Sequence, residues 1–87
     1  MSEDGQRHLN IRLRYFAVLR EQARRDSEEL QTSFTTPAQL YAELKTEKGF
    51  ALDQDALRVA VNGDFVDFDY SLKDGDEVVF IPPVAGG

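Results

Sequence analysis

The sequence predicts an α+β fold in which a mixed β-sheet carries one main helix across one face. Two observations predict it: several short segments alternate between apolar and polar residues, and one capped amphipathic segment lies between them at residues 36–49. Such a helix can bury its apolar stripe only by lying across the sheet. At 87 residues and 41% apolar content, the chain suffices for one core. We expect one domain over residues 8–82, a disordered extension over 1–7 and an extended, flexible tail over 83–87.

The first third of the chain predicts two strands and a short helix. Apolar and polar residues alternate strictly over Leu9–Tyr15, which is typical of a half-buried strand. Residues 17–25 are good helix formers, and the next two residues are expected to turn the chain. A second strand is expected over residues 30–34, where the alternation returns. Because Phe16 breaks the alternation of the first strand, its side chain should point away from the helix-covered core.

The main helix is expected to begin at Thr36. Thr36 can cap the helix, Pro37 suits its first position, and Gln39 completes a capping box. Gly49 is well placed to end the helix in the left-handed conformation. The residues assigned to the core from this helix and the last strand are Leu40, Leu44, Val78 and Phe80.

The second half of the chain predicts a hairpin and a final strand. Asn62-Gly63 lies between two apolar runs and is the strongest short hairpin signal. The unbroken apolar run after Glu77 predicts a strand covered on both faces. Pro82 and Pro83 lack amide hydrogens, so ladder pairing should end there. With the first and last strands side by side at the centre, this order matches by analogy the β-grasp, or ubiquitin-like, arrangement.

The net charge of −6 is concentrated in the C-terminal part of the chain. Residues 51–87 hold two basic residues against eight acidic ones, whereas residues 1–50 hold eight of each. The negative electrostatic field of this excess disfavours binding to nucleic acid and to anionic lipid, and it would help the tail end of the domain to dock on a basic partner. Ordinary solubility explains the charge equally well. No segment resembles a signal peptide or a membrane span, so a cytoplasmic location is expected.

No group inside the domain is expected to catalyse a reaction. The absence of cysteine excludes disulfides and thiolate metal sites, and His8 cannot form a metal cluster alone. Turn chemistry explains the paired acidic residues of the second half better than a metal site does. These are Asp67, Asp69, Asp74 and Asp76.

The tail is the candidate reactive segment. Gly86 and Gly87 lack side chains, so the carboxyl group of Gly87 can pass down a narrow channel. Residues 82–87 span about 20 Å at roughly 3.3 Å per residue, which is ample reach into the cleft of a partner. Pro82 and Pro83 would stiffen the root of the tail and lower the entropic cost of docking.

Four blocks of the sequence carry a resemblance to a known family. They are Arg14–Glu21, Ala60–Asn62, Asp74–Val78 and Pro82–Gly87. In this order and spacing they resemble the small, sulfur-carrying subunits of molybdopterin synthase, from about residue 9 to Gly87. The resemblance implies a β-grasp fold with a C-terminal Gly-Gly tail, and a role as sulfur carrier in molybdenum cofactor biosynthesis.

The resemblance implies that Gly87 is the reacting residue. In that family an activating enzyme uses ATP to adenylate the terminal glycine, and a sulfur donor displaces AMP to leave a thiocarboxylate. The tail enters the active site of the large subunit, where sulfur transfer converts cyclic pyranopterin monophosphate to molybdopterin. The implied partners are the activating enzyme, the sulfur donor and the large subunit, in a heterotetramer of two small and two large subunits. No bound cofactor, nucleic acid or membrane is implied, and the catalytic residues belong to the large subunit.

Further site residues follow from the same resemblance. The tail residues recognised by the partner would be Pro82, Pro83, Val84, Ala85 and Gly86. Phe16, Phe65 and Ile81 would form an apolar patch that binds the large subunit and, in turn, the activating enzyme. The alternative is that all three are core residues of a small domain. Two alternative functions stay open: a related carrier for thiazole, thionucleoside or protein conjugation chemistry, and a plain β-grasp interaction module.

Overall fold

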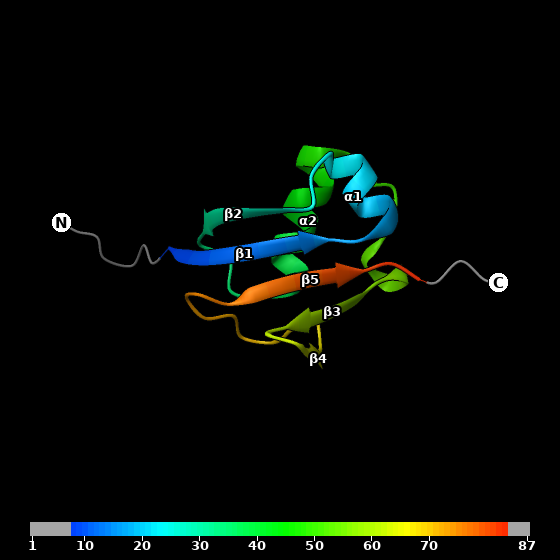
Figure 1. Ribbon diagram of the computed structural model, residues 1–87. Helices are drawn as coiled ribbons and strands as arrows, with labels where there is room; N and C mark the ends of the chain where they lie inside the picture. Colours follow the sequence, from blue (N-terminus) through cyan, green and yellow to red (C-terminus); the bar gives the residue numbers. More distant parts are fainter. Residues whose placement is uncertain (1–7, 84–87) are drawn as a thin grey trace.

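The computed structural model describes residues 8–83, which form a five-stranded mixed sheet and two α-helices (Figure 1). The strands are β1 (Leu9–Tyr15), β2 (Ser27–Thr32), β3 (Arg58–Val61), β4 (Asp64–Val66) and β5 (Glu77–Ile81). The helices are α1 (Ala17–Ala23) and α2 (Pro37–Lys48), and a 3-10 turn, η1 (Gln54–Ala56), follows α2. The predicted extension over residues 1–7 lies outside the described residues, and of the predicted tail only Pro83 lies within them.

The strand order β2-β1-β5-β3-β4 confirms the predicted β-grasp arrangement, with β1 and β5 side by side. These two strands are parallel, and Tyr15 is paired with Phe80 near their ends. Every other pairing in the sheet is antiparallel. Because parallel strands end at the same edge of a sheet, the residue after β1 lies beside the last residue of β5.

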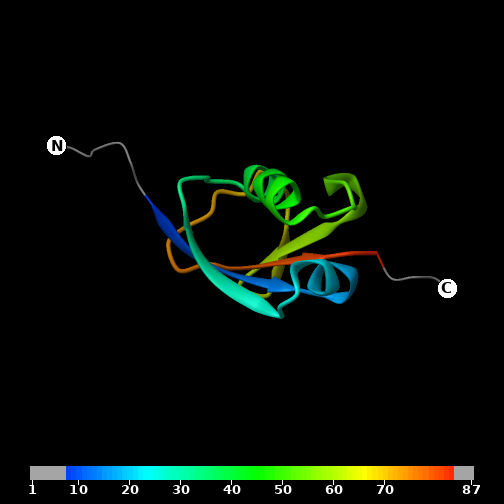
Figure 2. The ribbon, with the colours of Figure 1, turned by 90° about the horizontal axis from the view of Figure 1, so that it is seen from above.

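The core lies between α2 and one face of the sheet (Figure 2). Alternation along β1 and β5 points every second side chain toward the helix, as a half-buried strand requires. All four residues assigned to the core from the sequence are buried there. The largest fully buried side chains are Tyr41, Phe80, Ile11, Leu13, Leu19, Leu40, Val59, Val78 and Pro37.

The main helix begins and ends where the sequence predicts. The Thr36 hydroxyl accepts a hydrogen bond from the Gln39 backbone N–H at 3.2 Å, and Pro37 is the first helical residue. The Gln39 side chain does not close a standard capping box, because its oxygen accepts from the Thr35 N–H at 3.0 Å instead. Gly49 ends the helix at φ 72°, in the left-handed region.

Three boundaries in the first third differ from the prediction. Helix α1 ends at Ala23, because Arg24 adopts the left-handed conformation and its N–H bonds the Arg20 carbonyl. Strand β2 begins at Ser27, where pairing with Arg14 of β1 starts, three residues before the predicted start. It also ends at Thr32, whose hydroxyl accepts from the Phe34 N–H at 3.0 Å. This local hydrogen bond competes with the ladder and stops the strand.

The second half forms the predicted hairpin, with φ of 52° at Asn62 and 91° at Gly63, as a type I′ turn requires. Strand β5 differs from the prediction. Val78 and Phe80 are fully buried, but Glu77, Val79 and Ile81 are only half-buried. The expectation that β5 is covered on both faces is therefore wrong for the described residues, because α2 covers one face only.

Candidate docking face and tail root

The tail begins at the end of the central strand. β5 ends at Ile81, so ladder pairing stops at the two prolines as predicted. Pro82 is buried and Pro83 is exposed, which places the point of emergence from the domain between them. β5 has β1 on one side and β3 on the other, so the root of the tail is held by paired strands. Val84, Ala85, Gly86 and Gly87 lie outside the described residues.

The three predicted patch residues lie together on the sheet face opposite α2. Phe16 is 45% exposed and Phe65 is 63% exposed, and they are the exposed large apolar residues of the described chain. Ile81 is half-buried and occupies the outward position after the core residue Phe80. The backbone at Phe16 is extended, so its side chain also points outward, as the broken alternation predicted. The alternative of core positions is wrong for all three.

Two residues that the sequence analysis missed connect these three side chains across the sheet: Ala60, which is buried at 8% exposure, and Val79, which is half-buried. Ala60 is the register partner of both Phe65 on β4 and Val79 on β5, so one apolar row crosses three strands. We call the set Phe16, Ala60, Phe65, Val79 and Ile81 the apolar patch. Val79 could have been found from the sequence, because it is two residues before Ile81 and therefore points to the same face of the strand. It was missed because β5 was expected to be covered on both faces.

Arginines stand at two sides of the apolar patch. Arg14 pairs with Val79 across β1 and β5, and Arg58 pairs with Ile81 across β3 and β5. The guanidinium carbon of Arg58 lies 4.9 Å from the centroid of the Phe65 ring, which is a cation–π contact. Of the acidic residues over 51–87, only Glu77 holds an outward position on a strand. The acidic excess therefore lies mainly outside this face.

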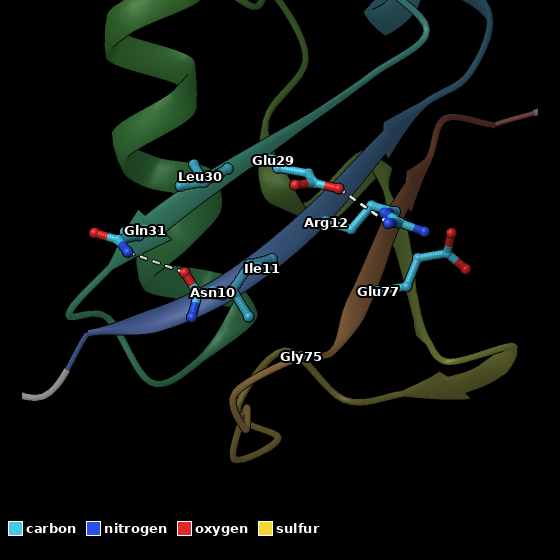
Figure 3. Close-up of a pocket in the computed structure, with 8 residues that line it drawn as sticks. All are labelled: Asn10, Ile11, Arg12, Glu29, Leu30, Gln31, Gly75 and Glu77. Atoms are coloured by element: carbon cyan, nitrogen blue, oxygen red, sulfur yellow. Dashed lines mark hydrogen bonds and ion pairs between the residues drawn. The ribbon is translucent and has the colours of Figure 1, made fainter.

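The other half of the same face is a polar hollow of about 510 Å³ (Figure 3). Four of its polar side chains are paired with one another. Arg12 contacts the Glu29 carboxylate at 2.9 Å, and the Gln31 amide donates to the Asn10 side-chain oxygen at 3.1 Å. The hollow is lined by Asn10, Ile11, Arg12, Glu29, Leu30, Gln31, Gly75 and Glu77.

A hydrogen-bonded carboxylate fixes the end of β1, directly before Phe16. The hydroxyl of Tyr15 donates to Glu28, which also contacts Lys48 at 3.0 Å and Arg25 at 3.1 Å. Burial and the bond to Glu28 raise the pKa of Tyr15, so its phenol stays protonated and donates. Burial alone would raise the pKa of Glu28, but Tyr15, Lys48 and Arg25 outweigh it and the pKa is lowered. Nothing in the sequence pattern indicated this cluster.

The acidic residues near β5 serve turns. Asp76 is 6% exposed, and its carboxylate accepts from the Asn62 amide and the Lys73 N–H, both at 2.8 Å. Asp74 accepts from the Asn10 N–H at 2.7 Å. The interpretation of this pair as turn residues is thereby confirmed. Within residues 8–83, no group of three or more potential ligands could hold a metal ion, and no helix is long and apolar enough to cross a membrane.

A five-stranded sheet of this order, with α2 across one face and β1 and β5 parallel at its centre, defines a ubiquitin-like β-grasp protein. The ThiS family model matches residues 13–87, and the chain belongs to that family.

Relatives in this family carry a consistent name. The chain is 39% identical over 80 residues to the molybdopterin synthase sulfur carrier subunit of Escherichia coli, which covers 88% of this chain and 99% of that protein. It is 36% identical over 77 residues to the subunit of the same name in Haemophilus influenzae, covering 84% of this chain and 94% of the relative. A solved structure, the putative molybdopterin converting factor subunit 1 of Pyrococcus furiosus, matches with TM-score 0.71 and 32% identity over 87% of this chain and 99% of that one.

Proposed function

We propose that this chain is the sulfur carrier subunit of a molybdopterin synthase and that the carboxyl group of Gly87 carries the sulfur. The observation that carries the proposal is the family match over residues 13–87, which includes Gly86 and Gly87. The two curated relatives at 36–39% identity share the name of this function.

The chemistry requires activation of the carboxyl group, because a carboxylate is a poor acyl electrophile. Attack of the Gly87 carboxylate on the α-phosphorus of ATP gives an acyl-adenylate and releases pyrophosphate. A sulfur nucleophile then displaces AMP and leaves a thiocarboxylate. In the large subunit, the thiocarboxylate sulfur bonds a side-chain carbon of cyclic pyranopterin monophosphate in place of an oxygen, which leaves as water or as phosphate. Hydrolysis of the resulting thioester breaks the acyl C–S bond and restores the Gly87 carboxylate, and a second loaded carrier supplies the second sulfur of the dithiolene.

The described residues support a carrier that presents its tail. Pro82 is buried in the domain, so the free length begins at Pro83 and spans about 16 Å to Gly87 at roughly 3.3 Å per residue. The apolar patch adjoins the root of this tail through Ile81, the last residue of β5. A partner that covers the patch is thereby brought to the start of the tail, while the domain itself needs no catalytic group.

Intact-mass analysis tests this function directly. The purified chain is incubated with the activating enzyme, ATP and sulfide, and then with the large subunit and cyclic pyranopterin monophosphate. In the first step we expect a mass increase that corresponds to the replacement of one oxygen by sulfur. In the second step the mass should return to its starting value as molybdopterin forms. No mass increase under conditions where a known carrier reacts would contradict the carrier function. A modified chain that loses no sulfur to the large subunit would instead favour a carrier for another pathway.

A further inference from the structure

The cation–π pair of Arg58 and Phe65 stands at the root of the tail. Arg58 is exposed on β3, and its register partner is Ile81, the residue directly before Pro82. Its guanidinium lies over the ring of Phe65, 4.9 Å from the centroid. A planar cation that is held over a ring retains its outward N–H donors and loses little entropy when it bonds a carboxylate.

The arginines on the outward sheet face differ in how they are paired. Arg12 contacts Glu29 at 2.9 Å, and Arg14 lies 3.9 Å from Glu77. Arg58 makes no ion pair within 4.0 Å with any residue in the range 8–83. The charge of Arg12 is thus balanced by Glu29 within the polar hollow. The charge of Arg58 has no such partner within residues 8–83 and is available to a group of a docking partner.

A hollow of about 420 Å³ adjoins this pair at the β3–β4 edge of the sheet. Five of its seven lining residues are apolar, but the surface that faces the hollow is somewhat more polar than apolar, with Arg58 and Asp67 supplying charged groups. Its lining residues are Leu57, Arg58, Val59, Phe65, Val66, Asp67 and Phe68. The apolar residues can receive an apolar side chain of a partner. Asp67 lies beyond 4.0 Å from the Arg58 guanidinium, so a partner that covers Arg58 is expected to supply a carboxylate of its own. Covering an unpaired charge with apolar surface alone carries a large desolvation penalty.

We propose that Arg58 is a specificity determinant for docking, and that it selects a protein surface with an apolar side chain for the hollow and a carboxylate for the guanidinium. The inference rests on the proposed function, under which this surface belongs to the synthase large subunit. A second copy of this chain is a poor occupant, because its own patch is flanked by arginines. A partner without the carboxylate would bury an unpaired cation and is rejected.

The test measures the dissociation constant for the large subunit of the same organism. Arg58→Glu is expected to weaken binding by about 10–100-fold, and Arg58→Gln by a smaller factor, since each leaves the partner carboxylate unpaired or repelled. Arg58→Gln should also make the affinity less sensitive to salt. The matched control is Arg12→Glu, which makes the same charge change on the same face and should alter the affinity by less than about twofold, because Arg12 is already paired with Glu29.

Two results would overturn the role of Arg58 without bearing on the proposed function. One is unchanged affinity for the large subunit in both Arg58 variants. The other is an equal loss of affinity in Arg12→Glu, which would indicate only a general electrostatic effect of the charge on this face. The proposed function fails differently, because then the unaltered chain neither gains sulfur at Gly87 nor binds the large subunit. Urea unfolding of each variant separates a lost contact from a lost fold. If Arg58→Glu unfolds, the neutral Arg58→Gln variant and its salt dependence decide the outcome.

Discussion

Removing one hydroxyl group from Tyr15 should destabilise the whole domain without touching the tail. Tyr15 is 2% exposed, and its hydroxyl donates to the carboxylate of Glu28. A hydrogen bond to a charged group contributes about 1.5–3 kcal/mol to stability. Because Tyr15→Phe keeps the ring and its packing, we expect the free energy of unfolding at neutral pH to fall by about that amount. With a urea m-value of about 1–1.5 kcal/mol/M for a small domain, the midpoint should move by roughly 1–3 M.

The effect of Tyr15→Phe should depend on pH through Glu28. The pKa of Glu28 is lowered below its ordinary 4.5 in the folded chain, so its stabilisation is present at neutral pH and is lost as pH falls through the folded pKa. Below that pH, the hydroxyl bonds a neutral acid and contributes only about 0.5–1.5 kcal/mol. Urea unfolding of the unaltered chain and of the Tyr15→Phe variant, at neutral and at acidic pH, measures how much the difference between their midpoints decreases in acid. Equal midpoints at neutral pH, or a gap that widens in acid, would refute the reasoning.

The remaining predictions concern the patch, the tail and a buried turn. Phe65→Ala should weaken large-subunit binding by about 5–30-fold, because the exposed 63% of this residue corresponds to about 1–2 kcal/mol of burial on docking. Phe80→Ala, at a fully buried position, should instead reduce the free energy of unfolding by about 3–5 kcal/mol; similar losses of stability in the two variants would place Phe65 in the core. Appending one residue after Gly87 should abolish sulfur transfer in the mass assay with an unchanged thermal midpoint, and a large drop in that midpoint would show a structural tail. Asp76→Ala should lower the free energy of unfolding by about 1–3 kcal/mol, because the Asn62 amide and the Lys73 N–H lose their acceptor; urea unfolding at the wild-type level would contradict this.

Local signals in the sequence predicted much of the fold. The capping residue Thr36 and the terminating Gly49 lie next to the helix ends that they specify, so α2 was predicted to within a residue. Asn62-Gly63 likewise contains its whole turn signal. The end of β2 was predicted too late, because the hydrogen bond between Thr32 and Phe34 competes with the ladder and leaves no trace in the apolar pattern.

The sequence by itself determined the alternation of β1 and the capped helix α2, since each depends on residues that are neighbours in the chain. Only the tertiary structure decided that Val79 and Ile81 are half-exposed, because burial of the second face depends on whether another element covers it. The same holds for Arg58, which register brings beside Ile81 and packing brings over Phe65. β3 and β5 are far apart in the chain and no single turn joins them, so no local turn signal fixes which of their residues pair.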